Sequence, residues 1–139
     1  MFPKWHVLFG IIFSLILYLF FQISLSNSLI VFLASVLIDA DHYLFYVKRK
    51  KDWNLKRAFR WFVALGKKHK PLILLFHNIE FLILILIISF LYNVFFFILI
   101  GLSFHLVSDF IYLIVSDRIE TKEFIFTRYL LTKDKRKYL

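Results

Sequence analysis

The sequence predicts an all-α fold, an integral membrane bundle of four transmembrane helices with an interfacial amphipathic helix between the second and the third. Hydrophobic residues make up 61% of the 139-residue chain, and 19 residues are phenylalanine, a composition unlike that of ordinary soluble domains. Four apolar runs are each about 20 residues long, the length at which a helix crosses the hydrocarbon of a bilayer. All 18 lysines and arginines lie between or beyond these runs.

The four expected spans together make a membrane domain over residues 1–117. They cover about residues 5–25, 28–47, 71–92 and 94–115. The first run lacks a small-x-small cleavage site, so we interpret it as a retained span rather than a signal peptide. Only Ser26-Asn27 separates the first two spans, and only Tyr92-Asn93 separates the last two. Connections this short join antiparallel neighbouring helices.

The basic residues mark one side of the membrane. Ten of them lie in the segment 48–70, seven lie in the tail 118–139, and the last is Lys4. In a four-span topology these positions share one side, and an excess of Lys and Arg marks the cytoplasm. We therefore expect a plasma (inner) membrane protein with both termini in the cytoplasm and a basic cytoplasmic tail over 118–139. Orientation accounts for the net charge of +9, so nucleic acid is not an expected partner.

The basic connection contains an amphipathic helix, expected over about residues 53–66. Its apolar residues recur at helical spacing, while lysines and arginines occupy the other face; they are Leu55, Ala58, Phe59, Phe62 and Val63. A helix of this kind lies in the headgroup layer, with membrane lipids as its partners.

Ionisable residues recur inside the apolar runs, where burying each one costs several kcal/mol. Each of the last three spans carries a histidine and a carboxylate on one helical face: Asp39 with His42, His77 with Glu80, and His105 with Asp109. At 1.5 Å per residue, these pairs all lie roughly 10–18 Å from the cytoplasmic helix ends. The side chains can therefore meet at one depth, and His6 would cap them from the headgroup side.

Histidines and carboxylates at one depth predict a metal site. The chain has no cysteine, so its ligands are nitrogen and oxygen. The candidate ligands are His6, Asp39, Asp41, His42, His77, Glu80, His105 and Asp109. Their number exceeds what one tetrahedral ion uses, so we expect one or two divalent ions, zinc by preference, with manganese or iron as alternatives.

Two of the acids have more than one interpretation. On a regular helix Asp41 points away from Asp39. Either the span is distorted there and Asp41 binds a second metal, or Asp41 orients a ligating imidazole. Glu80 is either a ligand or the general base. Asp41 and Glu80 are therefore also the candidate catalytic residues.

Three sequence elements carry a resemblance to a known family: Asp39-Ala40-Asp41-His42, His77-Asn78-Ile79-Glu80, and the segment from Gly101 through His105 to Asp109. The chain resembles the membrane-bound metal-dependent hydrolases, small inner-membrane proteins also described as LexA-binding. The resemblance covers about residues 6–112, although Ile38 replaces the usual proline and the His-Arg-Gly-x-Thr-His element has no clean counterpart. A more distant similarity, to the helical zinc phospholipase C and P1-type nuclease group, implies phosphoester cleavage.

These observations predict a metal-dependent hydrolase in which a metal-activated water attacks a phosphoester or another ester near the cytoplasmic leaflet. Basic residues at Lys48–Lys51 and Lys67–Lys70 would attract an anionic or phosphate-bearing substrate. Two alternatives stay open: a metal-ion or proton transporter, because intramembrane acids and histidines also form ion paths, and a metal-stabilised scaffold without turnover. The outer halves of the spans contain no Asp, Glu, His, Lys or Arg, which disfavours a path through the membrane.

Overall fold

Helices make up most of the protein. A computed structural model describes residues 3–65 and 69–138, so Lys67 and Lys68 of the expected basic collar lie outside the described residues. The α-helices are α1 (Pro3–Phe20), α2 (Leu25–Leu37), α3 (Ala40–Lys50), α4 (Leu55–Leu65), α5 (Ile79–Ser89), α6 (Asn93–Val115) and α7 (Phe126–Leu131). Two short strands and two 3₁₀ turns complete the described fold: β1 (Leu72–Ile73), η1 (Ile119–Thr121), β2 (Lys122–Glu123) and η2 (Lys135–Lys137).

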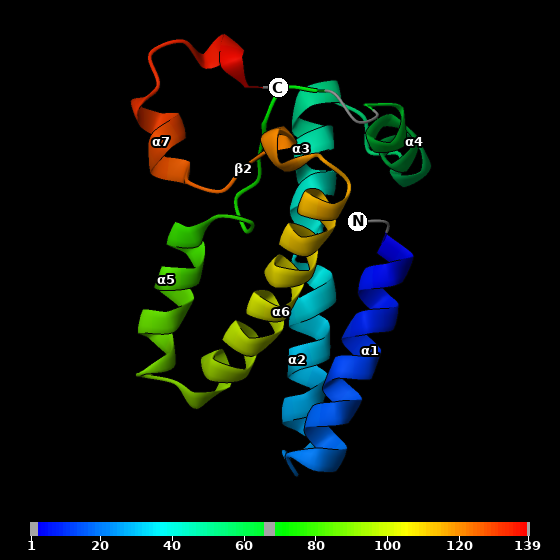
Figure 1. The fold of residues 1–139 in the computed structure, drawn as a ribbon, viewed down its shortest axis with the longest axis vertical. Coiled ribbons are helices and arrows are strands. Elements are labelled where there is room, and N and C mark those ends of the chain that lie inside the picture. The colour runs from blue at the N-terminus through cyan, green and yellow to red at the C-terminus, as the bar shows by residue number, and fades with distance from the viewer. Residues whose placement is uncertain (1–2, 66–68, 139) are drawn as a thin grey trace.

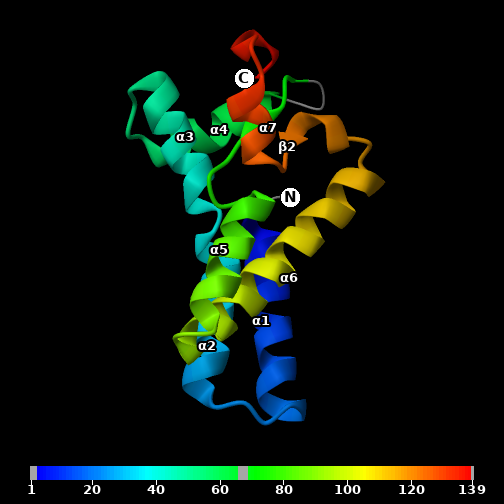
Figure 2. The same cartoon turned by 90° about the vertical axis from the view of Figure 1, so that its left-hand side faces the viewer.

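The longer helices run alongside one another as a bundle (Figures 1 and 2). α2 packs against both α1 and α6, and α5 packs against α6. The backbones of α2 and α6 approach closely at Gly101, where an added Cβ would lie 2.3 Å from the carbonyl oxygen of Val31. Small residues at helix crossings permit this approach in membrane proteins. α3, α4 and the C-terminal segment gather at one end of the bundle.

Within the part of the chain that the structure describes, two helical segments are long and apolar enough to cross a membrane: Leu25–Lys50, which includes α2 and α3, and Asn93–Val115. Two shorter apolar helices, Lys4–Phe20 and Ile79–Ser89, lie beside them. With 11 residues, α5 is only about 16 Å long, well short of the hydrocarbon thickness. Large apolar side chains cover the outside of the bundle, among them Leu19, Leu33 and Ile87.

The helix expected over residues 71–92 is formed only from Ile79 to Ser89. The residues before it make β1, which pairs in parallel with β2 of the C-terminal segment, and then a turn. Asn78 ends this turn, and its side-chain oxygen accepts a hydrogen bond from the backbone N–H of Phe81 at 3.0 Å. An asparagine at this position satisfies one of the free N–H groups at a helix start. The segment 118–139 was expected to be a separate tail, but its described residues, 118–138, are attached to the rest of the fold through β2.

The second expected span, 28–47, is interrupted by a turn at Ile38 and Asp39. The backbone N–H of Asp39 bonds to Val36 O at 3.4 Å, one residue later than the α-helical acceptor Ser35. Asp41 and His42 likewise bond three residues back, to Ile38 and Asp39. This tightened, 3₁₀-like turn breaks the regular angular spacing of side chains. It also leaves the carbonyl of Ser35 without its α-helical donor.

The helix expected over 53–66 is confirmed as α4, Leu55–Leu65. It packs on α3 through Tyr46, Val47 and Ala58. Asp52 fixes the corner between the two helices: the Tyr46 hydroxyl donates to it at 2.6 Å, and Arg57 Nε lies 3.1 Å away. The hydrogen bond from Tyr46, with one from the backbone of Asn54, holds the pKa of Asp52 below its usual value.

Candidate metal centre

Seven of the eight candidate ligands come together near the turn between α2 and α3. They form three overlapping groups whose potential ligand atoms lie within 4.8 Å of one another: His6 with His105 and Asp109, Asp39 with His77 and His105, and Asp41 with His42 and His77. The side chains come from α1, the turn at Asp39, α3, the turn before α5, and α6. All of them are buried except Asp39 and His42, which are partly exposed.

His77 and His105 are each oriented through their Nδ1 atom. Nδ1 of His105 lies 2.6 Å from the carbonyl oxygen of Ser35, the carbonyl that the tightened turn leaves without its helical donor. A carbonyl only accepts, so this Nδ1 carries the proton. Nδ1 of His77 lies 2.9 Å from Oδ2 of Asp41, an acceptor when ionised. In their neutral forms both rings therefore present an unprotonated Nε2, the arrangement common among metal-ligating histidines.

The two Nε2 atoms converge on the carboxylate of Asp39. They lie 3.2 Å from each other, and each is 3.5 Å from Oδ1 of Asp39. With bonds of about 2.0–2.1 Å, ligand atoms at tetrahedral angles lie about 3.3–3.4 Å apart. These three atoms thus have the spacing of one face of a tetrahedral site. Oδ2 of Asp109, at 3.9 Å from both histidine nitrogens, is the nearby fourth donor.

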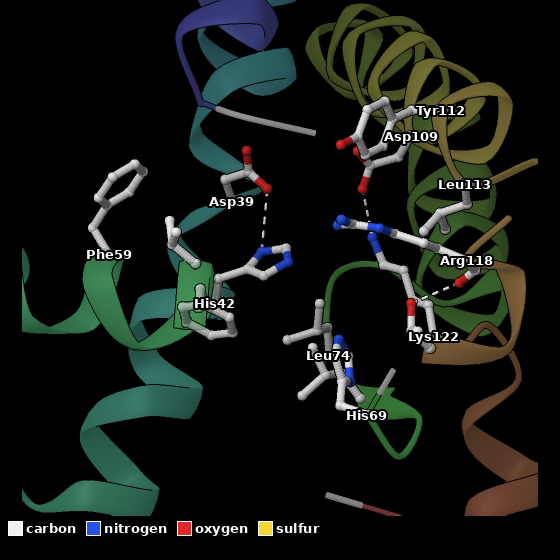
Figure 3. Close-up of a pocket in the computed structure, with 14 residues that line it drawn as sticks. Asp39, His42, Phe59, His69, Leu74, Asp109, Tyr112, Leu113, Arg118 and Lys122 are labelled. Atoms are coloured by element: carbon white, nitrogen blue, oxygen red, sulfur yellow. Dashed lines mark hydrogen bonds and ion pairs between the residues drawn. The ribbon is translucent and has the colours of Figure 1, made fainter. Parts of the chain in front are cut away.

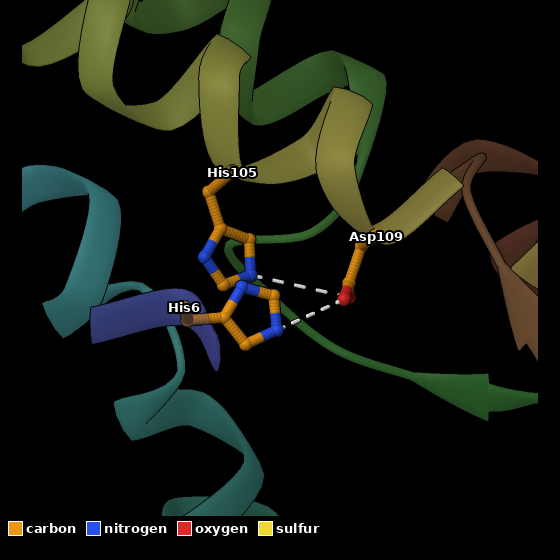
Figure 4. Close-up of side chains that lie close together, drawn as sticks. All are labelled: His6, His105 and Asp109. Carbon is orange, nitrogen blue, oxygen red and sulfur yellow. Dashed lines mark ion pairs between the residues drawn. The ribbon is translucent and has the colours of Figure 1, made fainter. Parts of the chain in front are cut away.

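His6 contacts the other oxygens of the same two carboxylates. Its Nε2 lies 3.1 Å from Oδ1 of Asp109 and 3.9 Å from Oδ2 of Asp39. The ring stacks on His105 with centroids 4.0 Å apart, and the three side chains of this group point toward one another (Figure 4). The side chain is 4% exposed, so His6 is buried inside the cluster and does not cap it from outside. Asp39 and Asp109 each offer one oxygen to His6 and one to the other histidines.

Asp41 joins the cluster because the tightened turn removes the regular helical spacing that separates it from Asp39. Its Oδ2 accepts hydrogen bonds from His77 Nδ1 and from the backbone N–H of Phe76 at 3.0 Å. Its Oδ1 lies 3.2 Å from Nδ1 of His42, which is also 3.1 Å from Asp39 Oδ1. Both interpretations of Asp41 therefore have a structural counterpart: the span is distorted, and Asp41 orients His77.

Glu80 belongs to none of the three groups found in the described residues. It lies in the first turn of α5, and its carboxylate accepts hydrogen bonds from the backbone N–H groups of Phe126 and Thr127 at 3.0 and 2.8 Å. Its interactions hold the start of α7 against α5. The helical spacing that pairs it with His77 does not apply, because His77 lies in the turn before the helix and not on it.

A cavity of about 290 Å³ opens beside the cluster. Asp39 and His42 lie on one wall and Asp109, Arg118 and Lys122 on the other (Figure 3). Lys122 was not singled out from the sequence, yet its Nζ lies 2.6 Å from Oδ2 of Asp109. Nothing local distinguishes it among the 18 basic residues, since the pairing of β2 with β1 is what brings it here.

The donor set fits a divalent cation. Histidine nitrogens and carboxylate oxygens bind zinc, and carboxylates also suit manganese or iron. Ionised carboxylates and neutral imidazole Nε2 atoms are all acceptors. Their convergence in a largely buried cluster is therefore unfavourable unless a positive charge lies among them. Lys122 supplies one at Asp109, and the protonation of a histidine would supply another. Within the described residues, no lysine or arginine forms an ion pair with the triangle of His77, His105 and Asp39.

A scan of the chain against protein-family models found no match, and neither did searches of curated proteins and of solved structures.

Proposed function

We propose that this protein is a membrane-embedded metal-dependent hydrolase that cleaves a phosphoester or another ester near the cytoplasmic leaflet. The observation that carries the proposal is the triangle formed by His77 Nε2, His105 Nε2 and Asp39 Oδ1, with sides of 3.2, 3.5 and 3.5 Å. These spacings suit a single cation. The resemblance of the motifs at Asp39 and His105 to membrane-bound metal-dependent hydrolases points to the same chemistry.

The ligands we assign are His77, His105, Asp39 and Asp109, with His6 placed for a second ion that shares the two carboxylates. One or two zinc ions suit this set best, and manganese or iron is the alternative. A divalent cation in such a site lowers the pKa of water toward 7 and so supplies a nucleophile at neutral pH. The residues around it must then orient the ligands, admit the substrate and move a proton.

His42 is the residue placed for proton transfer. Its Nδ1 lies within 3.2 Å of both Asp39 and Asp41, while the ring faces the cavity (Figure 3). With Nδ1 close to two carboxylates, the other ring nitrogen is available to exchange a proton with substrate or water. We assign this role to His42 in preference to Glu80, whose carboxylate is bound to backbone N–H groups.

The location we propose is the plasma (inner) membrane, with both termini and the metal cluster toward the cytoplasm. Two segments have the length and composition of membrane spans, and the exposed apolar side chains of the bundle suit contact with lipid. The described basic residues of α3, α4 and the C-terminal segment lie at one end of the bundle, as an excess of positive charge on the cytoplasmic side requires.

The first test is elemental analysis of protein purified in detergent without added metal. We expect one or two equivalents of zinc or manganese in the natural protein and in the control His69→Gln, and loss of metal in His105→Gln and Asp109→Asn. His69 is a suitable control because it lines the cavity but belongs to none of the ligand groups among the described residues. Full metal content in His105→Gln would refute the proposed site.

The second test separates the hydrolase from its alternatives. Hydrolysis of p-nitrophenyl phosphate, bis-p-nitrophenyl phosphate and p-nitrophenyl acetate is measured before and after metal removal and reconstitution. Metal-dependent turnover that is lost in His42→Gln supports the hydrolase. Metal flux into proteoliposomes without turnover would identify a transporter, and bound metal with neither activity would identify a scaffold.

A further inference from the structure

We propose that Arg118 and Lys122 form a phosphate-binding site on the wall of the cavity opposite Asp39 and His42. This inference rests on the proposed function, because it concerns the substrate of the same cavity, and it narrows that substrate from esters in general to compounds that carry a phosphate group.

Arg118 is the first observation. Its Nε is buried and has no hydrogen-bond partner among the described residues, although the side chain lines the cavity and its guanidinium points into it (Figure 3). A buried N–H group without an acceptor is unfavourable unless a ligand supplies one. A guanidinium presents several donors in one plane, and phosphate oxygens match that geometry.

Hydrogen bonds hold the backbone around Arg118 in place, so the fold sets the point from which its side chain enters the cavity. Its N–H bonds to Leu113 O at 2.8 Å, and that of Asp117 to Ile114 O at 3.1 Å, with Asp117 in a left-handed conformation at φ 52°. This pattern is a Schellman motif that ends α6. The carbonyl of Arg118 also accepts hydrogen bonds from the N–H and hydroxyl of Thr121 at 2.9 and 2.6 Å.

Lys122 provides the second positive charge. Its side chain is 6% exposed, and it reaches Asp109 from β2, whose pairing with β1 holds it in place. This wall thus carries two cations, Arg118 and Lys122, and one carboxylate, Asp109, which is paired with Lys122. The net positive charge of the wall, next to a proposed metal, favours a ligand with more than one negative oxygen. A phosphate group meets this requirement better than a neutral ester does.

Between these two walls the lining is mostly apolar, with Phe59, Phe62 and Val63 from α4 and Leu113 from α6, although His69, Tyr112 and Thr121 also reach it. A ligand in this cavity therefore meets both charged groups and hydrocarbon. Two sources share this chemistry, a phospholipid headgroup entering from the membrane and a soluble phosphate ester. The volume of about 290 Å³ suits a headgroup-sized moiety, since small-molecule sites begin at about 300 Å³.

The test measures the affinity of the purified, metal-loaded protein for inorganic phosphate by isothermal titration calorimetry in detergent. We expect Arg118→Gln to weaken phosphate binding at least tenfold and Arg118→Lys to weaken it less, with unchanged metal content in both. The control is Arg128→Gln, which removes an exposed arginine of the same segment outside the cavity and should bind phosphate like the natural protein. Binding by Arg118→Gln within twofold of the natural protein would overturn the proposal.

Two further arms identify the source of the phosphate group. Nanodiscs containing phosphatidic acid and soluble glycerol phosphate are each tested for competition with inorganic phosphate. Competition by either compound that is lost in Arg118→Gln supports the site and names its source, whereas the failure of both to compete overturns it. Arg118-dependent binding without hydrolysis would retain this site and reject the hydrolase. Metal-dependent hydrolysis that phosphate inhibits equally in the natural protein and in Arg118→Gln would retain the hydrolase and reject this phosphate site.

Discussion

The Nδ1 atom of His77 lies 2.9 Å from Oδ2 of Asp41, and this contact turns the opposite side of the imidazole toward His105 and Asp39. The same oxygen accepts the backbone N–H of Phe76 at 3.0 Å, so Asp41 holds both the ring and the turn that carries it. Such partners of ligating histidines fix the ring orientation and raise its basicity. In the proposed metal site, Asp41 would therefore position His77.

Asp41→Asn should weaken metal binding without abolishing it. We expect the dissociation constant of the metal to rise about 10- to 100-fold, the usual effect of losing a carboxylate behind a ligating histidine, with full occupancy at saturating metal. Competition against a chelator of known affinity measures this change, and Asp134→Asn in the C-terminal segment is the control. If Asp41→Asn bound no metal even at saturation, Asp41 would be a direct ligand instead.

Glu80→Ala should leave the metal content unchanged. The carboxylate of Glu80 accepts two backbone N–H groups at the start of α7, and its removal takes away both acceptors. We expect a lower midpoint of thermal unfolding and faster proteolysis of residues beyond Phe124, with Glu120→Ala as an exposed acidic control. Loss of bound metal in Glu80→Ala would return Glu80 to the set of ligands.

Much of the helical architecture can be predicted from the sequence, because long apolar periods and capping residues are local signals. The fourth expected span, 94–115, agrees with α6 to within one residue at its start, and the amphipathic pattern at 53–66 locates α4. The extended stretch before α5 has no such signal: its residues are as apolar as those of a span, and only pairing with Lys122 and Glu123 makes them a strand. Asn78, a residue type preferred at helix N-caps, is a local indication that the helix starts after it.

The candidate site, like the fold, can be predicted from the sequence only in part. Helical spacing places His105 and Asp109 together correctly, because both lie on α6 four residues apart. His77 also joins the cluster, but from the turn before α5 and not from a helix. Spacing and depth fail for Asp41 because a turn of three rather than four residues interrupts the helix there. They also omit Lys122 and the carbonyl of Ser35. Lys122 reaches the cluster through the pairing of β2 with β1, and the carbonyl of Ser35 is available because the helix is interrupted; no residue pattern predicts either feature.

Gly101→Ala should destabilise the bundle and weaken the metal site. The added Cβ would lie 2.3 Å from Val31 O and 2.9 Å from Ala34 Cβ, so α2 and α6 would have to separate, at a cost of about 1–3 kcal/mol. Their separation would also draw His105 away from the carbonyl of Ser35. Unfolding in mixed micelles measures stability, and chelator competition measures metal affinity.

Gly10→Ala is the matched control for that change. Its Cβ would meet the hydroxyl of Ser35 at 2.6 Å, a side-chain atom that can rotate away, so the effect should be smaller than that at Gly101. Equal stability of the two variants would show that the helices can adjust at Gly101 and that close packing there does not hold the site.

Asp117→Gly should stabilise the protein while leaving Arg118 in place. Asp117 adopts φ 52° at the position after α6 where glycine is preferred, because glycine has no Cβ to clash in the left-handed region. We expect a gain of about 1 kcal/mol or less, and a loss of roughly 1–2 kcal/mol in Asp117→Val. Asp117→Asn, which keeps the conformational tolerance and removes the charge, separates geometry from electrostatics.

The affinity of these variants for inorganic phosphate should follow the same order as their stability if the Schellman motif positions Arg118. We expect Asp117→Gly and Asp117→Asn to bind phosphate about as well as the natural protein and Asp117→Val to bind it more weakly. Phosphate binding by Asp117→Val equal to that of the natural protein would show that Arg118 reaches the cavity without this turn.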